Sequence, residues 1–309
     1  MASDQLFAGS IPYIYDTYLV PLIFEAYASD LARRVAEGAP TRVLETAAGT
    51  GVVTRALAPL LGKGARYFVS DLNQPMLERA ARRQDADDRI VWRQADALHL
   101  PFEEGSFDTV CCQFGVMFFP DRIAGYRETL RVLKPGGRFL FNVWDRIEYN
   151  DFARLVTDAV GAIFPSDPPR FLARTPHGYH DVEQIAAELR NAWFSTIEMV
   201  MLHQRSHAPS ARNPAMAYCQ GTPLRNEIET RDPEALSTVT DRAAEAIAKK
   251  HGQGPVSGKI QGHVIVASTT SRRASSTLPP LSRSALRERF RNSLSPHLLR
   301  DVGLDDSRR

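Results

Sequence analysis

The first half of the chain alternates between two patterns of apolar residues. Short, nearly continuous apolar runs predict buried strands, and segments with an apolar residue at every third or fourth position predict helices. The predicted strands cover residues 41–47, 65–71, 89–94, 107–114 and 137–144, and the predicted helices between them cover residues 51–62, 74–85 and 121–133. Strands that alternate with helices predict a parallel sheet covered on both faces, which is a doubly wound α/β fold.

The segments on either side of this region predict further helices and one more pair of strands. Residues 15–38 have helical spacing, and Pro21 is expected to split them into two helices because proline has no N–H group. After Trp144 the pattern predicts helices at 150–164 and 181–194, two helical segments between 210 and 250, and strands at 195–202 and 262–268. We expect the last two strands to pair as an antiparallel hairpin that completes a sheet of seven strands.

Composition and charge are those of an ordinary globular protein except at the C-terminal end. The 309 residues are 43% hydrophobic and 24% charged, and a net charge of +2 favours neither nucleic acid nor a membrane as a partner. From Thr270 onward there are nine Arg against one Glu and three Asp, a net charge of +5, so the preceding residues sum to about −3. The Ser, Arg and Pro content from Ser268 onward predicts a mostly disordered tail.

The cysteines and the N-terminus limit the class of protein further. Three cysteines, of which Cys111 and Cys112 are adjacent, fit neither a disulfide framework nor a zinc site and predict buried apolar side chains. No set of His and carboxylate residues has the spacing of metal ligands. The N-terminal residues show no basic stretch followed by an apolar core, and no apolar run is long enough to span a membrane. We therefore expect a cytoplasmic protein without a metal site.

A glycine turn after the first predicted strand is the clearest sign of a ligand site. The sequence VLETAAGTGVVT, residues 43–54, places Gly49 and Gly51 between a strand and a helix. Glycine allows positive φ and a close approach of the backbone to a ligand, and the following helix points its unpaired N–H groups at the turn. Glu45 ends the strand and is expected to face the ligand. The pattern favours a nucleotide-like ligand, with a plain strand–helix turn as the alternative.

The residues around this turn discriminate among nucleotide ligands. Asp71 ends the second predicted strand, 20 residues after Gly51, which is the usual offset of a carboxylate that binds ribose hydroxyls. Thr54 occupies the position of the third glycine of a dinucleotide-binding turn, and Glu45 would repel a diphosphate. S-adenosylmethionine (SAM) has no phosphate and carries a sulfonium and an ammonium group, which a carboxylate attracts. A P-loop is excluded because no Gly-Lys-Ser/Thr follows the turn. These features favour SAM over NAD or ATP.

Five motifs occur in order within about residues 40–145. They are VLETAAGTG from Val43, VSDLNQPMLERA from Val69, QADALHLPFEEGSFDTV from Gln94, FGVMFFPD from Phe114 and RVLKPGGRF from Arg131. In this order they resemble the class I SAM-dependent methyltransferases, and within them the branch of the ubiquinone and menaquinone C-methyltransferases (methyltransferase type 11). An ordered series is more specific than a single glycine loop. The resemblance implies a Rossmann-like methyltransferase fold with SAM as the cofactor.

The resemblance also assigns residues to the methionine portion of SAM. The turn from Glu45 to Gly51 would hold this portion, with backbone groups of Ala47 and Gly49 near its ammonium and carboxylate groups. Gln113, which closes the fourth strand, would lie beside the methyl group and the methionine tail. Ala47 stands where the family has its first glycine, which argues against positive φ at this position.

The adenosine portion is assigned to residues after the second and third strands. By resemblance, Asp71 would bind the ribose hydroxyls, and Leu72 and Met76 would pack against the adenine. Asp96 would accept a hydrogen bond from the adenine amino group, and the N–H of Ala97 would donate one to the ring. A turn or cap role for Asp96 and a core role for Met76 are the alternatives.

Two other conspicuous features are interpreted as structural. Asp108 is expected to be a turn carboxylate rather than a catalytic one. The sequence KPGG, residues 134–137, predicts a type II turn before the last parallel strand and not a phosphate site.

The methyl acceptor is expected to bind to the less patterned parts of the chain. The segment between Trp144 and Val264 and the N-terminal residues 10–24 would lie over the carboxyl ends of the strands, where open α/β sheets bind ligands. Their aromatic residues suit a small aromatic or apolar acceptor, or else only hold a lid helix in place. His177 and His180 are candidate catalytic bases, with surface loop histidines as the alternative.

The residues after the fourth strand narrow the class of acceptor. Enzymes that methylate amides or nucleobase amino groups often carry Asn/Asp-Pro-Pro-Tyr/Phe there, and this chain has CCQFGV instead. This difference disfavours DNA adenine and protein glutamine as acceptors without naming the true one. We expect no DNA partner, and we expect C- or O-methylation of a small, aromatic or apolar molecule by in-line displacement. A SAM-binding scaffold without activity is one alternative. A NAD-dependent oxidoreductase is another, disfavoured by Thr54 and by the absence of a Tyr-x-x-x-Lys constellation.

The expected organisation has four parts. An N-terminal helical lid (1–40) precedes a SAM-binding α/β core (41–145), an acceptor-binding insertion with the final strands (146–267) and an Arg/Ser-rich tail (268–309). The last two dozen residues resemble the end of an arginine-rich domain of unknown function found in small bacterial proteins. The tail is thus either an inert extension or a small appendage that contacts RNA or a regulator.

Overall fold

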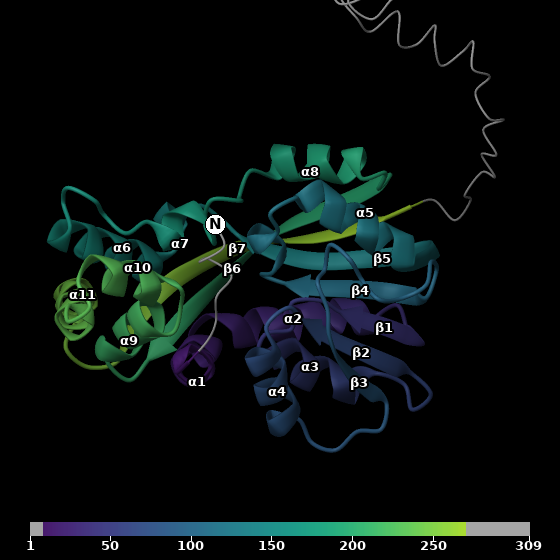
Figure 1. Cartoon of the computed structure of the whole chain (residues 1–309), viewed down its shortest axis with the longest axis horizontal. Coiled ribbons are helices and arrows are strands. Elements are labelled where there is room, and N and C mark those ends of the chain that lie inside the picture. Colours follow the sequence, from purple (N-terminus) through teal and green to yellow (C-terminus); the bar gives the residue numbers. More distant parts are fainter. Residues whose placement is uncertain (1–8, 270–309) are drawn as a thin grey trace, which may run out of the picture. The chain divides into compact units, whose positions relative to one another are not determined.

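The computed structural model describes residues 9–269, which form one seven-stranded sheet with helices on both faces (Figure 1). The strand order is β3-β2-β1-β4-β5-β7-β6. The strands β1 to β5 are parallel, and β7 pairs antiparallel with both β5 and β6. The strands are β1 (Arg42–Glu45), β2 (Arg66–Asp71), β3 (Ile90–Gln94), β4 (Phe107–Gln113), β5 (Leu133–Trp144), β6 (Thr196–Ala208) and β7 (Val256–Ser268). The predicted doubly wound α/β fold with an antiparallel last hairpin is confirmed. The tail from residue 270 lies outside the described residues, and its predictions stay predictions.

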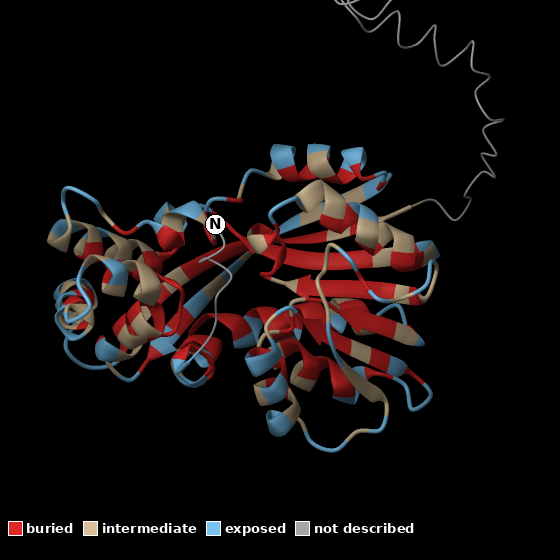
Figure 2. Ribbon diagram, in the orientation of Figure 1, coloured by how far each residue is buried: buried red, intermediate tan, exposed pale blue. Residues whose placement is uncertain are grey.

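The central strands are apolar because helices cover both of their faces. The helices α2 (Glu25–Ala36) and α3 (Val52–Leu57) pack on one face, and α5 (Arg122–Val132) and α8 (Val182–Asn191) lie on the other (Figure 1). The helix α4 (Gln74–Arg83) packs beside β2 and β3. Figure 2 shows that the middle of the sheet is buried along most of its length. The connecting loops lie at the ends of these buried strands.

The N-terminal segment is one continuous helix with a π-helical stretch in its middle. The short α1 (Ile11–Ile14) continues into the π-helix η2 (Tyr15–Phe24) and then into α2. The prediction that Pro21 splits this segment is wrong, because Pro21 lies inside the π-helical stretch. Hydrogen bonds in a π-helix span five residues rather than four, and this wider turn accommodates a residue that has no N–H group. Such stretches are frequent at functional sites.

The last two strands are longer than predicted and extend beyond the rest of the sheet. The strands β6 and β7 pair over their full length, whereas β5 pairs with β7 only from Arg138 to Trp144. The apolar pattern missed the outer part of β6 because the residues from His203 to His207 are all polar. The outer part of this ribbon carries the helices of the insertion (Figure 1).

The insertion contains more helices than predicted. The segment between residues 210 and 250 forms three helices rather than two, because Gly221 and Pro223 separate α9 from α10. Besides α8, the helices of the insertion are α6 (Asp151–Ile163), α7 (Phe171–Arg174), α9 (Arg212–Gln220), α10 (Leu224–Arg231) and α11 (Leu236–His251). Three short 3₁₀ turns are η3 (Ala58–Leu60), η4 (Val116–Phe118) and η5 (Ile147–Tyr149).

Both features interpreted as structural have the expected geometry. Gly136 has φ of 77°, the positive value that the third residue of a type II turn adopts. Residues 134–137 lie within β5, however, where the register with β4 shifts, so the prediction that they precede this strand is wrong. Asp108 accepts hydrogen bonds from the backbone N–H groups of Thr41 and Arg42, both at 2.8 Å, and pairs with Lys134. Burial alone would raise the pKa of Asp108, but the hydrogen bonds from Lys134 and Thr41 hold it well below its usual range. Asp108 therefore joins the starts of β1, β4 and β5.

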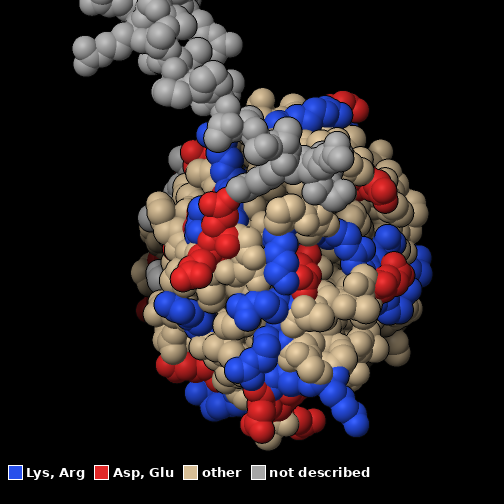
Figure 3. Space-filling view, turned by 90° about the vertical axis from the view of Figure 1, so that its right-hand side faces the viewer, with Lys and Arg blue, Asp and Glu red and all other residues tan. Residues whose placement is uncertain are grey.

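The charged side chains on the face shown in Figure 3 are of both signs and are interspersed. This mixture agrees with a net charge near zero for the whole chain. Within residues 9–269, no helix is both long enough and apolar enough to cross a membrane. In the same range no group of three or more His, Cys, Asp or Glu is placed to hold a metal ion.

Candidate functional site

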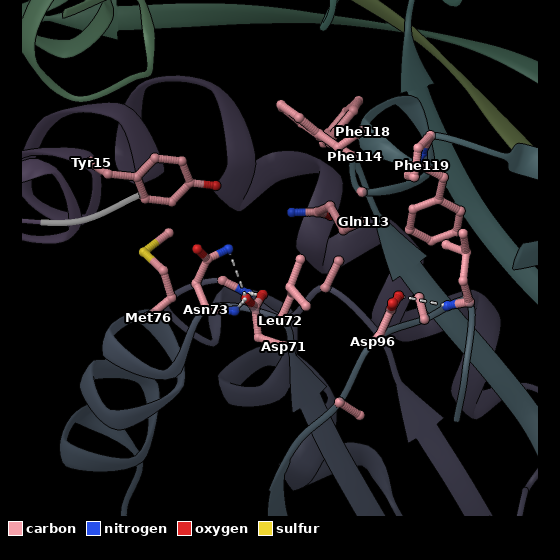
Figure 4. A pocket seen from close by; sticks show the side chains of 17 residues that line it. Tyr15, Asp71, Leu72, Asn73, Met76, Asp96, Gln113, Phe114, Phe118 and Phe119 are labelled. Carbon is pink, nitrogen blue, oxygen red and sulfur yellow. Dashed lines mark hydrogen bonds between the residues drawn. The ribbon is translucent and has the colours of Figure 1, made fainter. Parts of the chain in front are cut away.

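A cavity opens at the carboxyl ends of β1, β2 and β4 and encloses about 760 Å³, including its open mouth (Figure 4). It is lined by Tyr15, Ala47, Gly49, Asp71, Leu72, Asn73, Met76, Ala95, Asp96, Ala97, Leu98, Gln113, Phe114, Gly115, Phe118, Phe119 and Pro120. Eight of the ten residues assigned to the cofactor by resemblance are in this set. We call it the first cavity.

The turn after β1 presents its backbone to the first cavity. Ala47 has φ of 51° and Gly49 has φ of 57°, so both are in the left-handed region. The expectation that Ala47 would avoid positive φ is therefore wrong. Gly51, with φ of 78°, does not line the first cavity. A Cβ atom at Gly51 would lie 2.9 Å from the Cβ atom of Ala80, so this glycine allows α3 to begin close against α4.

Asp71 at the end of β2 fixes the shape of this turn. One carboxylate oxygen accepts a hydrogen bond from the N–H of Gly49 at 2.8 Å, and the other accepts one from the N–H of Asn73 at 2.7 Å. Burial raises the pKa of Asp71, and the hydrogen bonds from Asn73 and Gly49 partly offset this effect. Figure 4 shows Asp71 and Asn73 on the same side of the first cavity as Leu72. The carboxylate thus links two adjacent loops at the edge of the sheet.

Glu45 lies in the core and not on the lining of the first cavity. It is 1% exposed, and one carboxylate oxygen accepts hydrogen bonds from the hydroxyl groups of Thr54 at 2.7 Å and Tyr67 at 2.5 Å. Burial raises the pKa of Glu45 to about 7, although the hydrogen bonds from Tyr67 and Thr54 lower it. The expectation that Glu45 faces the ligand is not met in this structure, because Thr54 and Tyr67 hold the carboxylate beside the sheet.

The residues assigned to the adenine lie on two sides of the first cavity. Leu72 is 46% exposed and Met76 is 3% exposed, and both contribute to the lining. Asp96 accepts a hydrogen bond from the N–H of Leu98 at 2.9 Å, which closes a short turn after β3. Asp96 therefore has a turn role, and it also lines the cavity together with Ala97. Figure 4 shows Met76 and Asp96 on opposite sides.

Gln113 at the end of β4 directs its side-chain amide into the first cavity (Figure 4). Its nitrogen donates a hydrogen bond to the carbonyl of Phe24 at 3.3 Å. Its oxygen is buried and has no hydrogen-bond partner among the described residues. An unpaired buried oxygen is costly, and a bound ligand with a donor group would remove this cost.

A second cavity of about 490 Å³ adjoins the first. The two share Tyr15, Phe114 and Phe118 as lining residues, so these three side chains stand between them. Residues that line the second cavity alone are Leu19, Ile23, Phe24, Met117, Trp144, Phe171, Leu172, Pro176, His177, Tyr218 and Thr222. Its walls are mainly apolar and aromatic, as in many sites for small apolar molecules. It lies between the N-terminal helix and the insertion, where the acceptor site was expected.

The two candidate histidines have different surroundings. His177 is 5% exposed and lines the second cavity, and its Nδ1 forms a 2.8 Å hydrogen bond with the carbonyl of Asp145. Burial lowers the pKa of His177 to about 4. His180 lines neither cavity, and its Nδ1 bonds to the carbonyl of His177 at 2.8 Å. His177 is thus a buried residue and not a surface loop histidine.

The three residues that line both cavities were not among the single residues predicted from sequence. They are Tyr15, Phe114 and Phe118. Phe114 has φ of 49° and stacks on Trp144 with 3.8 Å between the ring centres. An aromatic residue in the left-handed region is strained, and such strain is concentrated at functional sites. The sequence signal for Phe114 is its position directly after Gln113, although no sequence pattern predicts its φ.

Comparison with known proteins identifies the family. The family model for a methyltransferase domain matches residues 44–141. Demethylmenaquinone methyltransferase of Clavibacter sepedonicus is 34% identical over 199 residues, which are 59% of this chain and 80% of that protein. The ubiquinone/menaquinone biosynthesis C-methyltransferase UbiE of Pectobacterium carotovorum is 29% identical over 168 residues, 50% of this chain and 67% of that protein.

A solved structure has the same fold at lower sequence identity. Phosphoethanolamine N-methyltransferase 2 of Haemonchus contortus, in complex with SAM, is 16% identical with a TM-score of 0.51. The match covers 84% of this chain and 56% of that chain. The strand order, the ordered motifs and the sequence relatives all indicate the same family. The chain belongs to the class I SAM-dependent methyltransferases, in the branch of the ubiquinone and menaquinone C-methyltransferases, and SAM is its cofactor.

Proposed function

We propose that this methyltransferase transfers the methyl group of SAM to a ring carbon of a small aromatic hydroxyl compound, such as a hydroquinone, bound in the second cavity. The observation that carries the proposal is the junction of the two cavities at Tyr15, Phe114 and Phe118. The names of the two relatives, which are methyltransferases of quinone substrates, favour an aromatic acceptor, and that of the second favours carbon over oxygen as the accepting atom.

The residues of the first cavity fit SAM. The unpaired oxygen of Gln113 would accept a hydrogen bond from the ammonium group of the methionine portion. Ala47 and Gly49 both have positive φ, and their backbone groups would face the methionine portion of SAM. When bound, SAM supplies a methyl group made reactive by the adjacent positive sulfur.

The adenosine portion would lie between Asp71 and the loop after β3. The carboxylate of Asp71 would accept hydrogen bonds from the ribose hydroxyls, since each of its oxygens can accept more than one. Leu72 and Met76 would pack against one face of the adenine. Asp96 and the N–H of Ala97 would form hydrogen bonds with its edge.

The second cavity supplies apolar surface for an aromatic ring. Trp144, Phe24 and Phe171 line it, and Phe114 stacks on Trp144 at the boundary with the first cavity. Aromatic rings recognise one another by stacked or edge-on contacts in addition to burial. Because the walls are apolar, they also exclude water from the reacting atoms.

His177 is the proposed proton acceptor for the ring hydroxyl. A carbonyl oxygen can only accept a hydrogen bond, so Nδ1 must carry the proton in the contact with Asp145. With a pKa of about 4 the ring is neutral at pH 7, which leaves a lone pair on Nε2. A hydrogen bond from the acceptor hydroxyl to Nε2 would increase electron density on the ring. As the ring carbon bonds to the methyl carbon and the methyl–sulfur bond breaks, the hydroxyl proton would move to Nε2 and SAH would leave. The methylated ring carbon would then release its own hydrogen as a proton to solvent, and Nε2 would return its proton to the oxygen, which restores the aromatic hydroxyl compound.

Methyl-labelled SAM tests the accepting atom. The protein is incubated with ¹³C-methyl SAM and a panel of hydroquinones, phenols and amines, and products are analysed by mass spectrometry and ¹³C NMR. We expect a hydroquinone product with its methyl group on carbon. A methyl group on oxygen or nitrogen would contradict the assignment. Binding of SAM without any product would instead favour the scaffold alternative.

His177→Ala and His180→Ala form a matched pair for the proton acceptor. We expect His177→Ala to lower kcat by about 10²-fold or more, the usual contribution of a general base, with unchanged SAM affinity. His180→Ala should retain kcat because His180 lines neither cavity. Equal kcat values for His177→Ala and the wild-type protein would show that His177 is not the proton acceptor.

A further inference from the structure

A buried carboxylate, faced by three partly exposed arginines, joins the N-terminal helix to the SAM-binding core. Asp16, in η2, is 2% exposed, and one of its carboxylate oxygens lies 2.7 Å from Arg79 and 2.5 Å from Arg83, both in α4. Arg55 of α3 lies 4.0 Å from the other oxygen, which has no hydrogen-bond partner among the described residues. We call these four residues the Asp16 cluster. One carboxylate thus faces three guanidinium groups.

The Asp16 carboxylate is the single negative charge among the three guanidinium groups, so it determines the geometry of the Asp16 cluster. Burial alone would raise the pKa of Asp16, but the hydrogen bonds from Arg83 and Arg79 keep the pKa below its usual range. Asp16 is therefore ionised at neutral pH. Without this carboxylate, three positive side chains, which are 24% to 44% exposed, would face one another with no negative charge between them, and their repulsion would be only partly screened.

The residue next to Asp16 in the chain stands at the junction of the two cavities. Tyr15 lines both the first and the second cavity. Figure 4 shows its ring entering the first cavity from the N-terminal helix, on the side of Met76. Consecutive residues of a helix point in different directions, so Asp16 reaches α4 while Tyr15 reaches the cavities. The position of the Tyr15 ring therefore depends on where the Asp16 cluster holds η2.

The same α4 helix also contributes to the first cavity. Met76 lies in the first turn of α4 and lines the first cavity, while Arg79 and Arg83 follow one and two turns later. Arg79 additionally lies over the ring of Tyr13, with 5.1 Å to the ring centre. The Asp16 cluster thus connects the helix above the first cavity to the helix that forms one of its walls.

We infer that Asp16 is a positioning residue for methyl transfer, which holds Tyr15 between the cofactor and the acceptor through its contacts with Arg79 and Arg83. The inference rests on the proposed placement of SAM in the first cavity. The Tyr15 ring would close this cavity over the methyl group, and its electron-rich face suits a neighbouring sulfonium cation. S-adenosylhomocysteine (SAH), the product, lacks this charge, so Tyr15 would favour SAM over SAH.

The test compares Asp16→Asn with Asp30→Asn. Asp30 is also buried in the N-terminal helix, at 7% exposure, and binds Arg33 at 2.9 Å and Arg34 at 2.6 Å, but it lines neither cavity. It controls for a general loss of helix stability. Dissociation constants for SAM and SAH are measured by calorimetry at a temperature where each variant is folded.

We expect Asp16→Asn to bind SAM about tenfold more weakly, the size of a lost contact to a charged group, with a smaller change for SAH. Asp30→Asn should bind both ligands as the wild-type protein does. In a Tyr15→Ala background, Asp16→Asn should have no further effect, because the two residues act as a unit. If Asp16→Asn does not fold, Arg83→Gln replaces it, with an expected loss of about threefold.

Three results would overturn the inference. The first is SAM affinity in Asp16→Asn equal to that of the wild-type protein. The second is an equal loss of affinity in Asp16→Asn and Asp30→Asn. The third is an additive effect of Asp16→Asn and Tyr15→Ala. Absence of SAM binding by the wild-type protein would contradict the proposed cofactor site itself, and the inference with it.

Discussion

At the scale of single residues, the first cavity is built around backbone conformations that most side chains avoid. Ala47, Gly49 and Phe114 all have positive φ and all line this cavity. For Ala47 and Phe114 this conformation costs about 1–2 kcal/mol each. The buried core around them offsets this cost. Strain at two lining positions, Ala47 and Phe114, agrees with a site selected for ligand geometry rather than for stability.

Asp71→Ala tests the cofactor assignment at this scale. The variant loses the acceptor for Gly49 and Asn73 as well as the proposed ribose contact. We expect SAM affinity to fall at least about tenfold, since hydrogen bonds to a charged group are lost. Calorimetry with SAM is the measurement, and thermal unfolding checks that the variant is folded. Unchanged affinity would refute the role of Asp71.

Glu45→Gln tests the burial of the β1 carboxylate through the pH dependence of stability. The pKa of Glu45 rises from 4.5 to about 7 on folding. The folded state therefore binds the Glu45 proton more tightly than the unfolded state does. The resulting contribution to the free energy of unfolding is present below pH 4.5 and is lost as the pH rises to 7. The loss is about 3 kcal/mol at most, at about 1.4 kcal/mol per pKa unit.

The comparison between Glu45→Gln and the wild-type protein isolates this effect from other titrating groups. His177 has the opposite pH dependence. Its pKa is lowered from 6.5 to about 4 on folding, so its contribution to stability is lost as the pH falls from 6.5 to 4. We expect the free energy of unfolding of Glu45→Gln, minus that of the wild-type protein, to increase between pH 5 and pH 8. Chemical denaturation at both pH values measures it. A difference that does not change with pH would mean that Glu45 is not buried as described.

At the scale of elements, the motifs and the strands of the sheet were predictable because each depends on residues that are close together in the sequence. The Ala47, Asp71, Asp96 and Gln113 positions follow strands that alternate with helices, and parallel strands bring their carboxyl ends to one edge. The π-helix at Pro21 was not predictable in this way. Its geometry depends on what packs against it, and the local rule for proline indicates only a break.

Asp108→Ala tests a link between elements at the opposite ends of the strands. The side chain joins the starts of β1, β4 and β5 through Thr41, Arg42 and Lys134. We expect a loss of about 2 kcal/mol in unfolding free energy, because two backbone N–H groups and one lysine lose their partner. SAM affinity should be retained, since Asp108 lines neither cavity. Denaturant unfolding and calorimetry on the same sample separate the two effects, and intact stability would contradict the structural role.

At the scale of the whole molecule, the acceptor site could be located only roughly from sequence. The second cavity is formed by η2, the loop after β4, the end of β5, α7 and α9, which are far apart in the chain. Their meeting depends on how the insertion packs on the N-terminal helix, and no single motif encodes that. The sequence indicated segments that line the second cavity, including His177, whereas Tyr15, Phe114 and Phe118 became apparent only from the structure.

A crystal structure with SAH and a hydroquinone tests the central proposal most directly. We expect SAH in the first cavity, with its sulfur atom facing Tyr15, Phe114 and Phe118, and the hydroquinone in the second cavity with a ring carbon nearest that sulfur. The hydroquinone hydroxyl should lie within hydrogen-bond distance of Nε2 of His177. A sulfur atom that faces away from the second cavity, or a hydroquinone bound elsewhere, would contradict the proposal.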